Sequence, residues 1–372
     1  MHKKKIMFFI YRLGGGGASR TFLNIINHID REKFTPILVT LDFTYNYEQY
    51  VKDDVIFIKL PTKRLRKAIK PLAKLIKEER PDLLMSTIPV YNTVLILANM
   101  LSRTKTKIVV REAAHLGGTW KENMKLKLFG KLYNTTNQVI ALSQGVKTNL
   151  INRYKVKDSK IKVIYNPVDI EHIVAESEQA VEQKALFSNS HKKIITAGRL
   201  VKEKDQDTLI KAFAKVTEET NSELYILGEG ELETDLKQLT EKLNVAHKVH
   251  FLGFQENPYA YFKEADVFAL TSLTEGFGHV FVEALALGLP IVTTKCEPGA
   301  SEVLQNGKYG YVANVGDVDG VAAQLGQALL LEGSNKEQVI NKGKERAADF
   351  HVEKIVSAYE KMFQAVIGED VK

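Results

Sequence analysis

The stretch of sequence that decides the fold reads Thr-Glu-Gly-Phe-Gly-His-Val-Phe-Val-Glu-Ala, from Thr274 to Ala284. It follows an apolar run typical of a strand, 266–270, and opens a segment in which Phe281, Leu285 and Leu289 recur every four residues, as on a helix face. A glycine-rich turn between a strand and a helix leaves free backbone N–H groups at the positive end of the helix dipole. The stretch therefore predicts a phosphate site.

The same stretch carries two carboxylates eight residues apart, Glu275 and Glu283. We expect Glu283 to lie inside the helix and Glu275 at its mouth, about two helical turns away if the helix includes both. Two acids do not bind phosphate. They suit instead the hydroxyl-rich parts of a ligand, its ribose and its sugar.

This arrangement, followed by a small-residue helix that ends at Gly288-Leu289-Pro290, resembles the retaining family 4 glycosyltransferases of GT-B fold. The resemblance implies that Glu275 contacts the donor sugar and that Glu283 holds the ribose. It also implies that the donor diphosphate contacts the turn formed by Gly276, Phe277, Gly278 and His279. The alternative is a surface helix with two solvated acids after a tight turn.

A second motif follows the apolar run 193–197 and reads Gly198-Arg199-Leu200, with Lys204 four residues further on. It resembles the family's diphosphate clamp, which implies that Arg199 and Lys204 grip the donor phosphates. A departing diphosphate gains charge, and a fixed guanidinium and ammonium stabilise such a leaving group. In the same family the base contacts the backbone near Phe254, whose ring either neighbours the base or packs in the core.

The composition is that of a globular protein of two domains: 372 residues, 44% hydrophobic and 26% charged. The single cysteine, Cys296, allows no intramolecular disulfide and fits a reducing compartment. No apolar run approaches the roughly 20 residues of a membrane span, and no signal peptide is visible. We expect a cytoplasmic protein, either free or associated peripherally with the inner face of the plasma membrane.

The net charge of +7 is unevenly distributed. Residues 1–170 hold 31 Lys and Arg against 13 Asp and Glu, a net charge of +18, whereas residues 171–372 carry −11. This asymmetry indicates an anionic partner for the N-terminal half, such as phospholipid, a lipid diphosphate or nucleic acid. Solvated helix faces are the alternative.

Strand and helix patterns alternate along both halves, with short loops, which predicts doubly wound parallel sheets. With the resemblance, the expected fold class is α/β of GT-B type: two Rossmann-like domains facing a central cleft. We expect an acceptor-side domain over 1–170, a connection over 171–192 and a nucleotide-sugar domain over 193–350. A final helix within 351–372 would return toward the N-terminal domain.

Two loops of the N-terminal half lie beyond the carboxyl ends of predicted strands, where such sheets bind ligands. The first holds four glycines, of which Gly16 best matches the family's loop facing the donor. The second, 109–118, often supplies a histidine beside the donor sugar in the resembled family. His115 is our catalytic candidate there, with Glu112 second and a solvated or core histidine as the alternative.

Two other motifs are weaker. Gly14-x-Gly16-x-x-Ser19 lacks the last glycine of a dinucleotide fingerprint. Asp317-Val318-Asp319 has the form of a metal chelate, but it precedes an Ala/Leu-rich helix, where acids cap N–H groups. We therefore expect no metal and no cofactor, and the donor is a substrate.

The function that these motifs imply is retaining transfer of a hexosyl or N-acetylhexosaminyl group from a nucleotide sugar. UDP-GlcNAc, UDP-GalNAc or UDP-Glc is the favoured donor, and a glycan, polymer or lipid-linked molecule of the cell envelope is the acceptor. The rival hypotheses are a nucleotide-sugar epimerase of the same fold and a non-enzymatic nucleotide-sugar or glycan-binding protein. Nucleic acid is not expected, because the basic half shows no recognition motif.

The cations of Lys63–Lys77 indicate an anionic membrane surface as a further partner. Leu65, Ile69, Leu72 and Ile76 share one helix face, and seven cations occupy the rest. Pro71 fits best in a first turn, so the helix starts near 70 with a basic loop before it. Each cation near an anionic leaflet contributes about 1 kcal/mol. The alternative is that the apolar stripe packs on the sheet and the cations are merely solvated.

Overall fold

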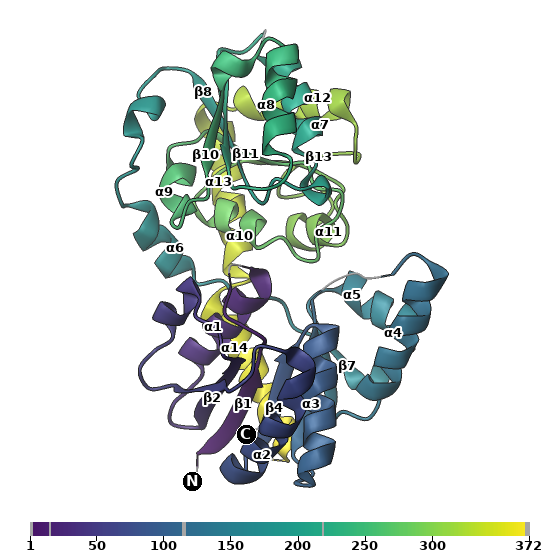
Figure 1. Ribbon diagram of the computed structural model, residues 1–372. Helices are drawn as coiled ribbons and strands as arrows, with labels where there is room; N and C mark the ends of the chain where they lie inside the picture. The colour runs from purple at the N-terminus through teal and green to yellow at the C-terminus, as the bar shows by residue number, and fades with distance from the viewer. Residues whose placement is uncertain (1–2, 15, 114–116, 218, 369–372) are drawn as a thin grey trace. The chain divides into compact units, whose positions relative to one another are not determined.

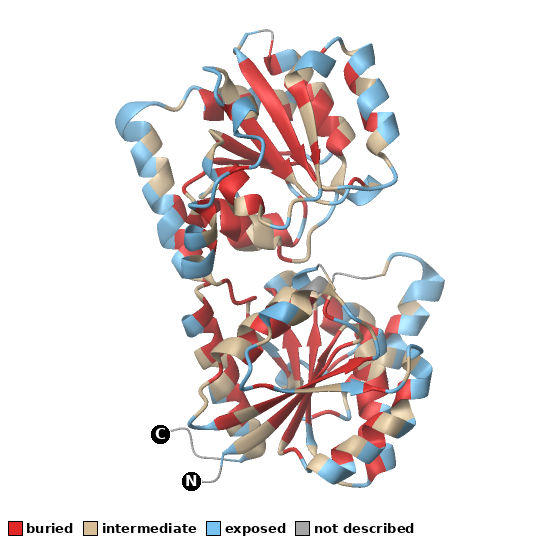
Figure 2. Cartoon of the chain, turned by 60° about the vertical axis from the view of Figure 1, so that its left-hand side comes forward, coloured by how far each residue is buried: buried red, intermediate tan, exposed pale blue. Residues whose placement is uncertain are grey.

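The computed structural model describes residues 3–14, 16–113, 117–217 and 219–368. It consists of two compact units (Figure 1), an N-terminal one of Met1–Val168 with Val352–Lys372 and a C-terminal one of Asp169–His351. In each unit helices cover a fully parallel sheet whose central strands are buried (Figure 2). The predicted pair of doubly wound α/β sheets is confirmed.

The N-terminal sheet has the order β3-β2-β1-β4-β5-β6-β7, so the strand order reverses between β1 and β4. Its strands are β1 (Lys4–Phe9), β2 (Phe34–Leu41), β3 (Ile56–Leu60), β4 (Leu83–Thr87), β5 (Lys107–Glu112), β6 (Gln138–Ala141) and β7 (Ile161–Val163). Its α-helices are α1 (Gly17–His28), α2 (Ile69–Glu79), α3 (Pro89–Ser102), α4 (Trp120–Tyr133), α5 (Gln144–Asn149) and α14 (Val352–Ile367).

Two details of this unit follow from local chemistry. Helix α2 begins at Ile69 after a 3-10 turn, Leu65–Ala68, so Pro71 lies in its first turn, where a missing N–H does no harm. The terminal helix α14 packs on this unit, because the Phe363 ring meets Phe8 and Phe34 edge-on.

The C-terminal sheet has the order β10-β9-β8-β11-β12-β13 and reverses between β8 and β11. Its strands are β8 (Lys192–Ala197), β9 (Ser222–Leu227), β10 (Val249–Gly253), β11 (Val267–Leu270), β12 (Ile291–Thr294) and β13 (Tyr311–Ala313). Its α-helices are α6 (Ile170–Ser177), α7 (Gln206–Val216), α8 (Glu233–Lys242), α9 (Pro258–Lys263), α10 (His279–Ala286), α11 (Gly299–Leu304), α12 (Val318–Leu329) and α13 (Gly333–Ala348).

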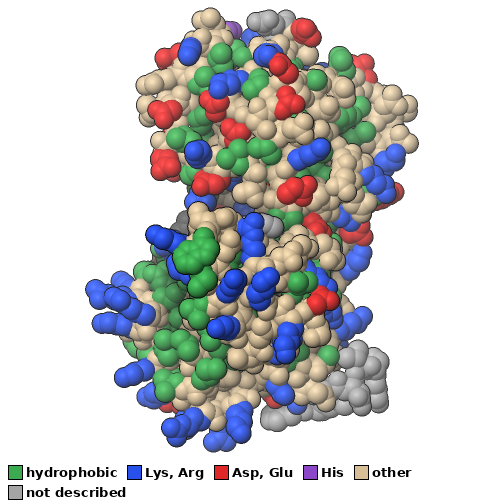
Figure 3. All heavy atoms as spheres, turned by 90° about the vertical axis from the view of Figure 1, so that its right-hand side faces the viewer, with side chains coloured by type: hydrophobic (Ala, Val, Ile, Leu, Met, Phe, Trp, Pro, Cys, Tyr) green, Lys and Arg blue, Asp and Glu red, His purple; other side chains and the backbone are tan. Residues whose placement is uncertain are grey.

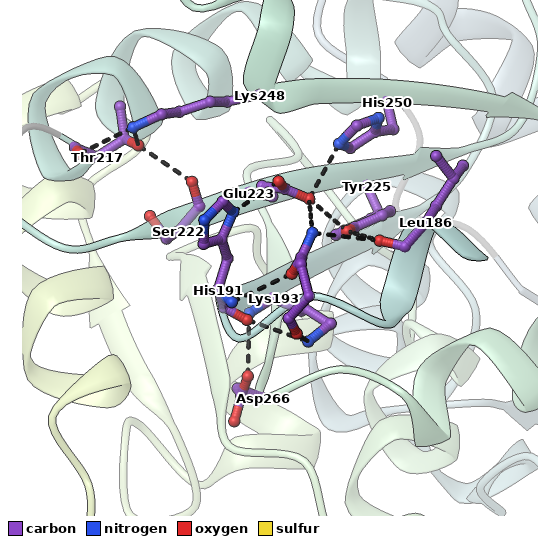
Figure 4. A network of polar contacts seen from close by, with 11 residues as sticks. Leu186, His191, Lys193, Thr217, Ser222, Glu223, Tyr225, Lys248, His250 and Asp266 are labelled. Atoms are coloured by element: carbon purple, nitrogen blue, oxygen red, sulfur yellow. Dashed lines mark hydrogen bonds and ion pairs between the residues drawn. The ribbon is translucent and has the colours of Figure 1, made fainter. Parts of the chain in front are cut away.

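The segment 171–192, expected as a connection, belongs to the C-terminal unit. A polar network at the start of β9 holds the end of this segment in place (Figure 4). The Glu223 carboxylate lies 2.7 Å from His191 Nδ1 and 3.1 Å from His250 Nε2. It also accepts hydrogen bonds from the Asn189 amide and the Tyr225 hydroxyl. Burial would raise the pKa of Glu223, but the hydrogen bonds from Tyr225, His191 and Asn189 outweigh it and lower the pKa to about 2.

Among the described helices, none has both the length and the apolar character that crossing a bilayer requires.

Candidate active site

The central site of the C-terminal unit lies where its strand order reverses. Strands β8 and β11 are neighbours, with Val267 in register with Ile194. The loops that leave their carboxyl ends carry the two motifs found in the sequence, one with Arg199 and Lys204 and the other with Glu275. Open parallel sheets bind ligands at this point.

Hydrogen bonds join these two loops. The Leu273 N–H donates to the Glu203 carbonyl at 2.9 Å, and the Thr271 hydroxyl donates to the Asp205 carbonyl at 2.7 Å. These hydrogen bonds hold the two loops against each other.

Across this junction the Lys204 ammonium donates to Glu275 Oε1 and forms an ion pair with it. The Ser272 hydroxyl donates to the same carboxylate oxygen at 2.9 Å. Lys204 is 22% exposed and Glu275 14%, so both remain accessible yet largely screened from water. Two residues predicted to act on the donor are thus brought together, and Ser272 is a partner that no sequence signal marked.

Arg199 has a fixed backbone and an exposed side chain. Its carbonyl accepts from Nε2 of Gln206, a buried residue at the start of α7, at 3.0 Å. Within the described part of the chain, its guanidinium has no hydrogen-bond partner. The group is therefore available to an anionic ligand.

The loop after β9 packs directly on the loop after β8. Gly228 has φ +126°, and a Cβ there would lie 2.1 Å from the Gly198 carbonyl oxygen, so this position accepts only glycine. The Phe254 N–H donates to Glu229 Oε1 at 3.4 Å, while the Phe254 side chain is 61% exposed. Phe254 therefore does not pack in the core, and its ring is free to neighbour a base.

The turn before α10 has the geometry that the sequence predicts. Gly278 has φ +74°, and a Cβ there would lie 2.6 Å from the Phe281 ring. The Phe277 ring is buried, with edge-on contacts to Phe350 and His279, so Phe277 offers the turn its backbone only. His279 is the first residue of α10, so the positive end of the helix dipole lies here and favours an anion.

The two acids of this stretch occupy different environments. Glu283 lies within α10 and is 4% exposed, whereas Glu275 precedes the helix. The Glu275 carbonyl accepts from the Gly299 N–H at 2.8 Å, which ties the loop after β12 to the site. Cys296 in that loop is buried, and burial raises the pKa of its thiol to about 12. It is therefore a neutral packing residue.

In the N-terminal unit Gly16 precedes α1, at the sheet edge where β1 ends. Its φ of 178° is extended, and a Cβ there would meet nothing within 4 Å. The backbone thus needs no glycine here, and the residue leaves open space beside the loop. His115, the histidine candidate for the donor sugar, lies outside the described residues.

Glu112, the second candidate in that loop, ends β5 and is fully buried. Its Oε2 accepts from the Tyr133 hydroxyl at 3.0 Å and its Oε1 from the Ala113 N–H at 3.1 Å. Burial raises the pKa of Glu112 to about 7, although the Tyr133 hydrogen bond opposes the shift. Glu112 therefore faces the interior and does not offer its carboxylate to a donor.

Asp317-Val318-Asp319 is a helix cap. The Asp317 carboxylate accepts from the Gly320 N–H at 2.8 Å at the start of α12, and Asp319 pairs with Lys215. The described residues also contain no group of three or more His, Cys, Asp or Glu that could hold a metal ion.

Comparison with known proteins agrees with this architecture. Residues 15–172 match the family model "Glycosyltransferase Family 4", and residues 177–346 match "Glycosyl transferases group 1". The chain is 29% identical over 370 residues to N-acetylgalactosamine-N,N'-diacetylbacillosaminyl-diphospho-undecaprenol 4-alpha-N-acetylgalactosaminyltransferase of Campylobacter jejuni, covering 95% of this chain and 97% of the relative. It is 34% identical over 234 residues to N-acetyl-alpha-D-glucosaminyl L-malate synthase of Bacillus anthracis, covering 61% of this chain and 60% of the relative.

Solved structures share the fold. Anabaena HepE in complex with UDP and glucose superimposes with a TM-score of 0.83 at 21% identity, covering 97% of this chain and all of HepE. A glycosyltransferase of Rickettsia africae gives a TM-score of 0.84 at 17% identity, with full coverage of both chains. With each half of the chain matched by a glycosyltransferase family model and the whole by such structures, the chain belongs to the family 4-like glycosyltransferases of GT-B fold.

Proposed function

We propose that this glycosyltransferase moves a hexosyl or N-acetylhexosaminyl group from a UDP-linked sugar, with retention of configuration, to a glycan, polymer or lipid-linked acceptor of the cell envelope. The observation that carries the proposal is the Lys204–Glu275 ion pair at the strand-order reversal of the C-terminal sheet. The pair supports the proposal because an ammonium suits phosphate, a carboxylate accepts from sugar hydroxyls, and the two lie side by side. The turn before α10 follows Glu275 in the chain.

In the proposed reaction, the bond between the anomeric carbon and the diphosphate oxygen breaks, and its electron pair stays on the diphosphate. Lys204, Arg199 and the N–H groups at the start of α10 stabilise that charge. The acceptor hydroxyl oxygen bonds to the same face of the anomeric carbon, and its proton passes to the leaving phosphate. Glu275 orients the sugar through its hydroxyls and Glu283 the ribose. The positive charge comes from the protein, so the step requires no metal.

The relatives support the substrate classes. The Campylobacter relative is named for alpha transfer of N-acetylgalactosamine to a diphospho-undecaprenol-linked glycan, and HepE was solved with UDP, glucose and UDP-glucose. We therefore favour UDP-GalNAc, UDP-GlcNAc or UDP-Glc as donor. A lipid-linked acceptor would lie in a membrane, so we propose peripheral association with the inner face of the plasma membrane.

Ligand-induced thermal stabilisation by UDP, GDP and ADP tests the base. A ligand at about 100 times its dissociation constant adds roughly 2.7 kcal/mol to folding stability, and UDP should show the largest effect. With UDP-sugar and acceptor, NMR of the product should show the anomeric configuration of the donor. Isomerisation of the free UDP-sugar without acceptor would instead support an epimerase, and binding without turnover a non-enzymatic role.

A further inference from the structure

Helix α4 packs against the N-terminal unit through one face only. Leu126, Gly130 and Tyr133 are buried, and a Cβ at Gly130 would lie 1.7 Å from the Tyr154 carbonyl oxygen, so this side is in tight contact with the 150–154 turn. The opposite side is open to solvent and carries a row of large apolar side chains at a spacing of four residues: Trp120, 74% exposed; Met124, 49%; Leu128, 60%.

Helix α3, which packs between α2 and α4, adds a second group of exposed apolar side chains. The group comprises Val90, Leu97, Met100 and Leu101, each more than a third exposed. Figure 3 shows hydrophobic side chains gathered on the N-terminal unit, on the side that carries α3 and α4 in Figure 1, with Lys and Arg side chains around them. Contiguous apolar surface of this kind marks an interaction site.

Cations flank the apolar row of α4 on both sides. At 100° per residue, Lys121 and Lys125 follow the row on one side, and Lys127 and Lys131 lie on the other. All four are exposed. The one acid of the helix, Glu122, accepts from the Thr119 N–H at 2.9 Å in a capping box. The Glu122 carboxylate is thus engaged at the N-terminus of the helix.

A basic hollow of about 980 Å³ lies at the carboxyl end of α3, with Leu101 in its wall. Lys70, Lys74 and Lys77 of α2 line it from one side, and Arg103, Lys105 and Lys107 after α3 line it from the other. Its one acid, Asp82, accepts from the Lys5 N–H at 2.8 Å and lies 3.8 Å from Lys4 Nζ. The hollow is therefore a cationic surface beside apolar side chains, and suits phosphate groups.

The apolar stripe of Lys63–Lys77 is only partly open to a partner. Leu72 and Ile76 are fully buried against the unit, and the cations of this stretch are exposed. Leu65 and Ile69 are half-buried, so this stretch offers a partner mainly its charge. Most of the exposed large apolar side chains of this unit lie on α3 and α4.

We infer that α3, α4 and the basic hollow form one surface that docks the N-terminal unit on an anionic lipid bilayer. Trp120, Met124 and Leu128 lie at the boundary between headgroups and acyl chains, with the lysines of α4 at the phosphates. A second copy of the chain is a poor occupant, because a symmetric contact through this face would place lysines against lysines. The inference rests on the proposed function in one respect: a lipid-linked acceptor lies in such a bilayer.

Trp120 is the only tryptophan of the chain, so its fluorescence reports directly on this surface. The full chain is titrated with phosphatidylcholine vesicles with and without phosphatidylglycerol, at low and high salt. We expect binding only to the anionic vesicles at low salt, with a blue-shifted Trp120 spectrum that lipids brominated in the upper acyl chain quench. No binding to anionic vesicles at low salt, or binding with an unchanged and unquenched spectrum, overturns the inference.

Two variants separate the apolar and the charged contributions in co-sedimentation. Replacing Trp120, Met124 and Leu128 with Ser should lower the partition coefficient about 100-fold. Replacing Lys121, Lys125, Lys127 and Lys131 with Gln should lower it more, up to about 1000-fold at about 1 kcal/mol for each lysine. The matched controls lie in the C-terminal unit, Val315→Ser with Leu330→Ser, and Gln at Lys184, Lys242, Lys342 and Lys344; neither control should change binding.

Equal losses in variants and controls, or full binding by the Ser variant, contradict the docking surface. Analytical ultracentrifugation covers the other occupant: a dimer that the Ser variant dissolves, while vesicle binding persists, also overturns it. Far-UV circular dichroism checks that each variant folds. UDP binding in solution is measured on the same proteins, so failure of the docking surface remains distinguishable from failure of the proposed glycosyl transfer.

Discussion

Removing the Lys204 ammonium is the sharpest test of the site. In the structure it lies against Glu275 at the strand-order reversal, 22% exposed. A unit charge that develops about 4 Å from it, on the leaving diphosphate, interacts by about 4 kcal/mol at an effective dielectric constant near 20. Losing one such contact costs roughly 2.7–4 kcal/mol in the transition state. We expect Lys204→Ala to lower kcat about 100- to 1000-fold, measured as UDP release with acceptor present.

The matched control is Lys202→Ala. Lys202 has the same charge and belongs to the same 3-10 turn, Lys202–Lys204, but it is exposed and contacts neither Glu275 nor Ser272 in the structure. Its loss should change kcat less than about threefold, because isolated surface charges contribute 0–1 kcal/mol. Equal activities of the two variants and the parent would refute the assignment of Lys204 to the leaving group.

A double-mutant cycle separates catalysis from the ion pair itself. If Lys204 and Glu275 act on one transition state, the effects of Lys204→Ala and Glu275→Gln on kcat/KM should not add. The unfolding free energies of the same variants should show the ion pair's own contribution to stability, because Lys204→Ala leaves the Glu275 carboxylate, only 14% exposed, without its cation. Additive kinetic effects would mean that the two residues act independently.

Three further predictions concern other parts of the chain. By calorimetry, Glu283→Gln should weaken UDP itself, whereas Glu275→Gln should spare UDP and damage only sugar transfer; equal losses in both would reject the split. For Glu112, burial raises the pKa from its ordinary value of 4.5 to about 7 in the folded state. The folded state therefore binds the proton more tightly than the unfolded state, and stability falls as pH rises from about 4.5 to 7. Denaturant unfolding should show the unfolding free energy of the parent falling by up to about 3 kcal/mol over this range, whereas Glu112→Gln should not show the fall. An unfolding free energy that rises with pH in the parent and not in the variant would contradict the prediction. Gly228→Ala should lower both the melting temperature and the UDP affinity, because the new Cβ would lie 2.1 Å from the Gly198 carbonyl oxygen. Gly326→Ala is the control: the position lies within α12 with open space around it, so its unfolding free energy should rise by about 0.5–1 kcal/mol.

Much of the fold was accessible from the sequence because local patterns carry it. The continuous apolar strands and the 3.6-residue helical period predict parallel doubly wound sheets, and the structure has two of them. The turn at Gly276–Gly278 and the helix start at His279 also follow from local sequence. Gly278 has φ +74°, a conformation that favours glycine, and α10 begins directly after it. Pro71 likewise places the start of α2.

The tertiary structure alone decided which residues meet. Lys204 and Glu275 are 71 positions apart, and only the neighbouring strands β8 and β11 bring them onto each other and onto Ser272. Glu112 looked like a loop residue facing a ligand, but its strand turns it inward toward Tyr133. A one-residue change of direction in a strand inverts exposure, and a single sequence does not determine it.

The same limit applies to helix faces. The sequence alone determined that α2 has an apolar stripe among cations, but not whether that stripe packs or stays open. In the structure Leu72 and Ile76 are buried, whereas Trp120, Met124 and Leu128 of α4 remain exposed. Periodicity shows that a face is apolar, but burial depends on the elements that cover it. The tertiary structure alone therefore decided which face is left open to a partner.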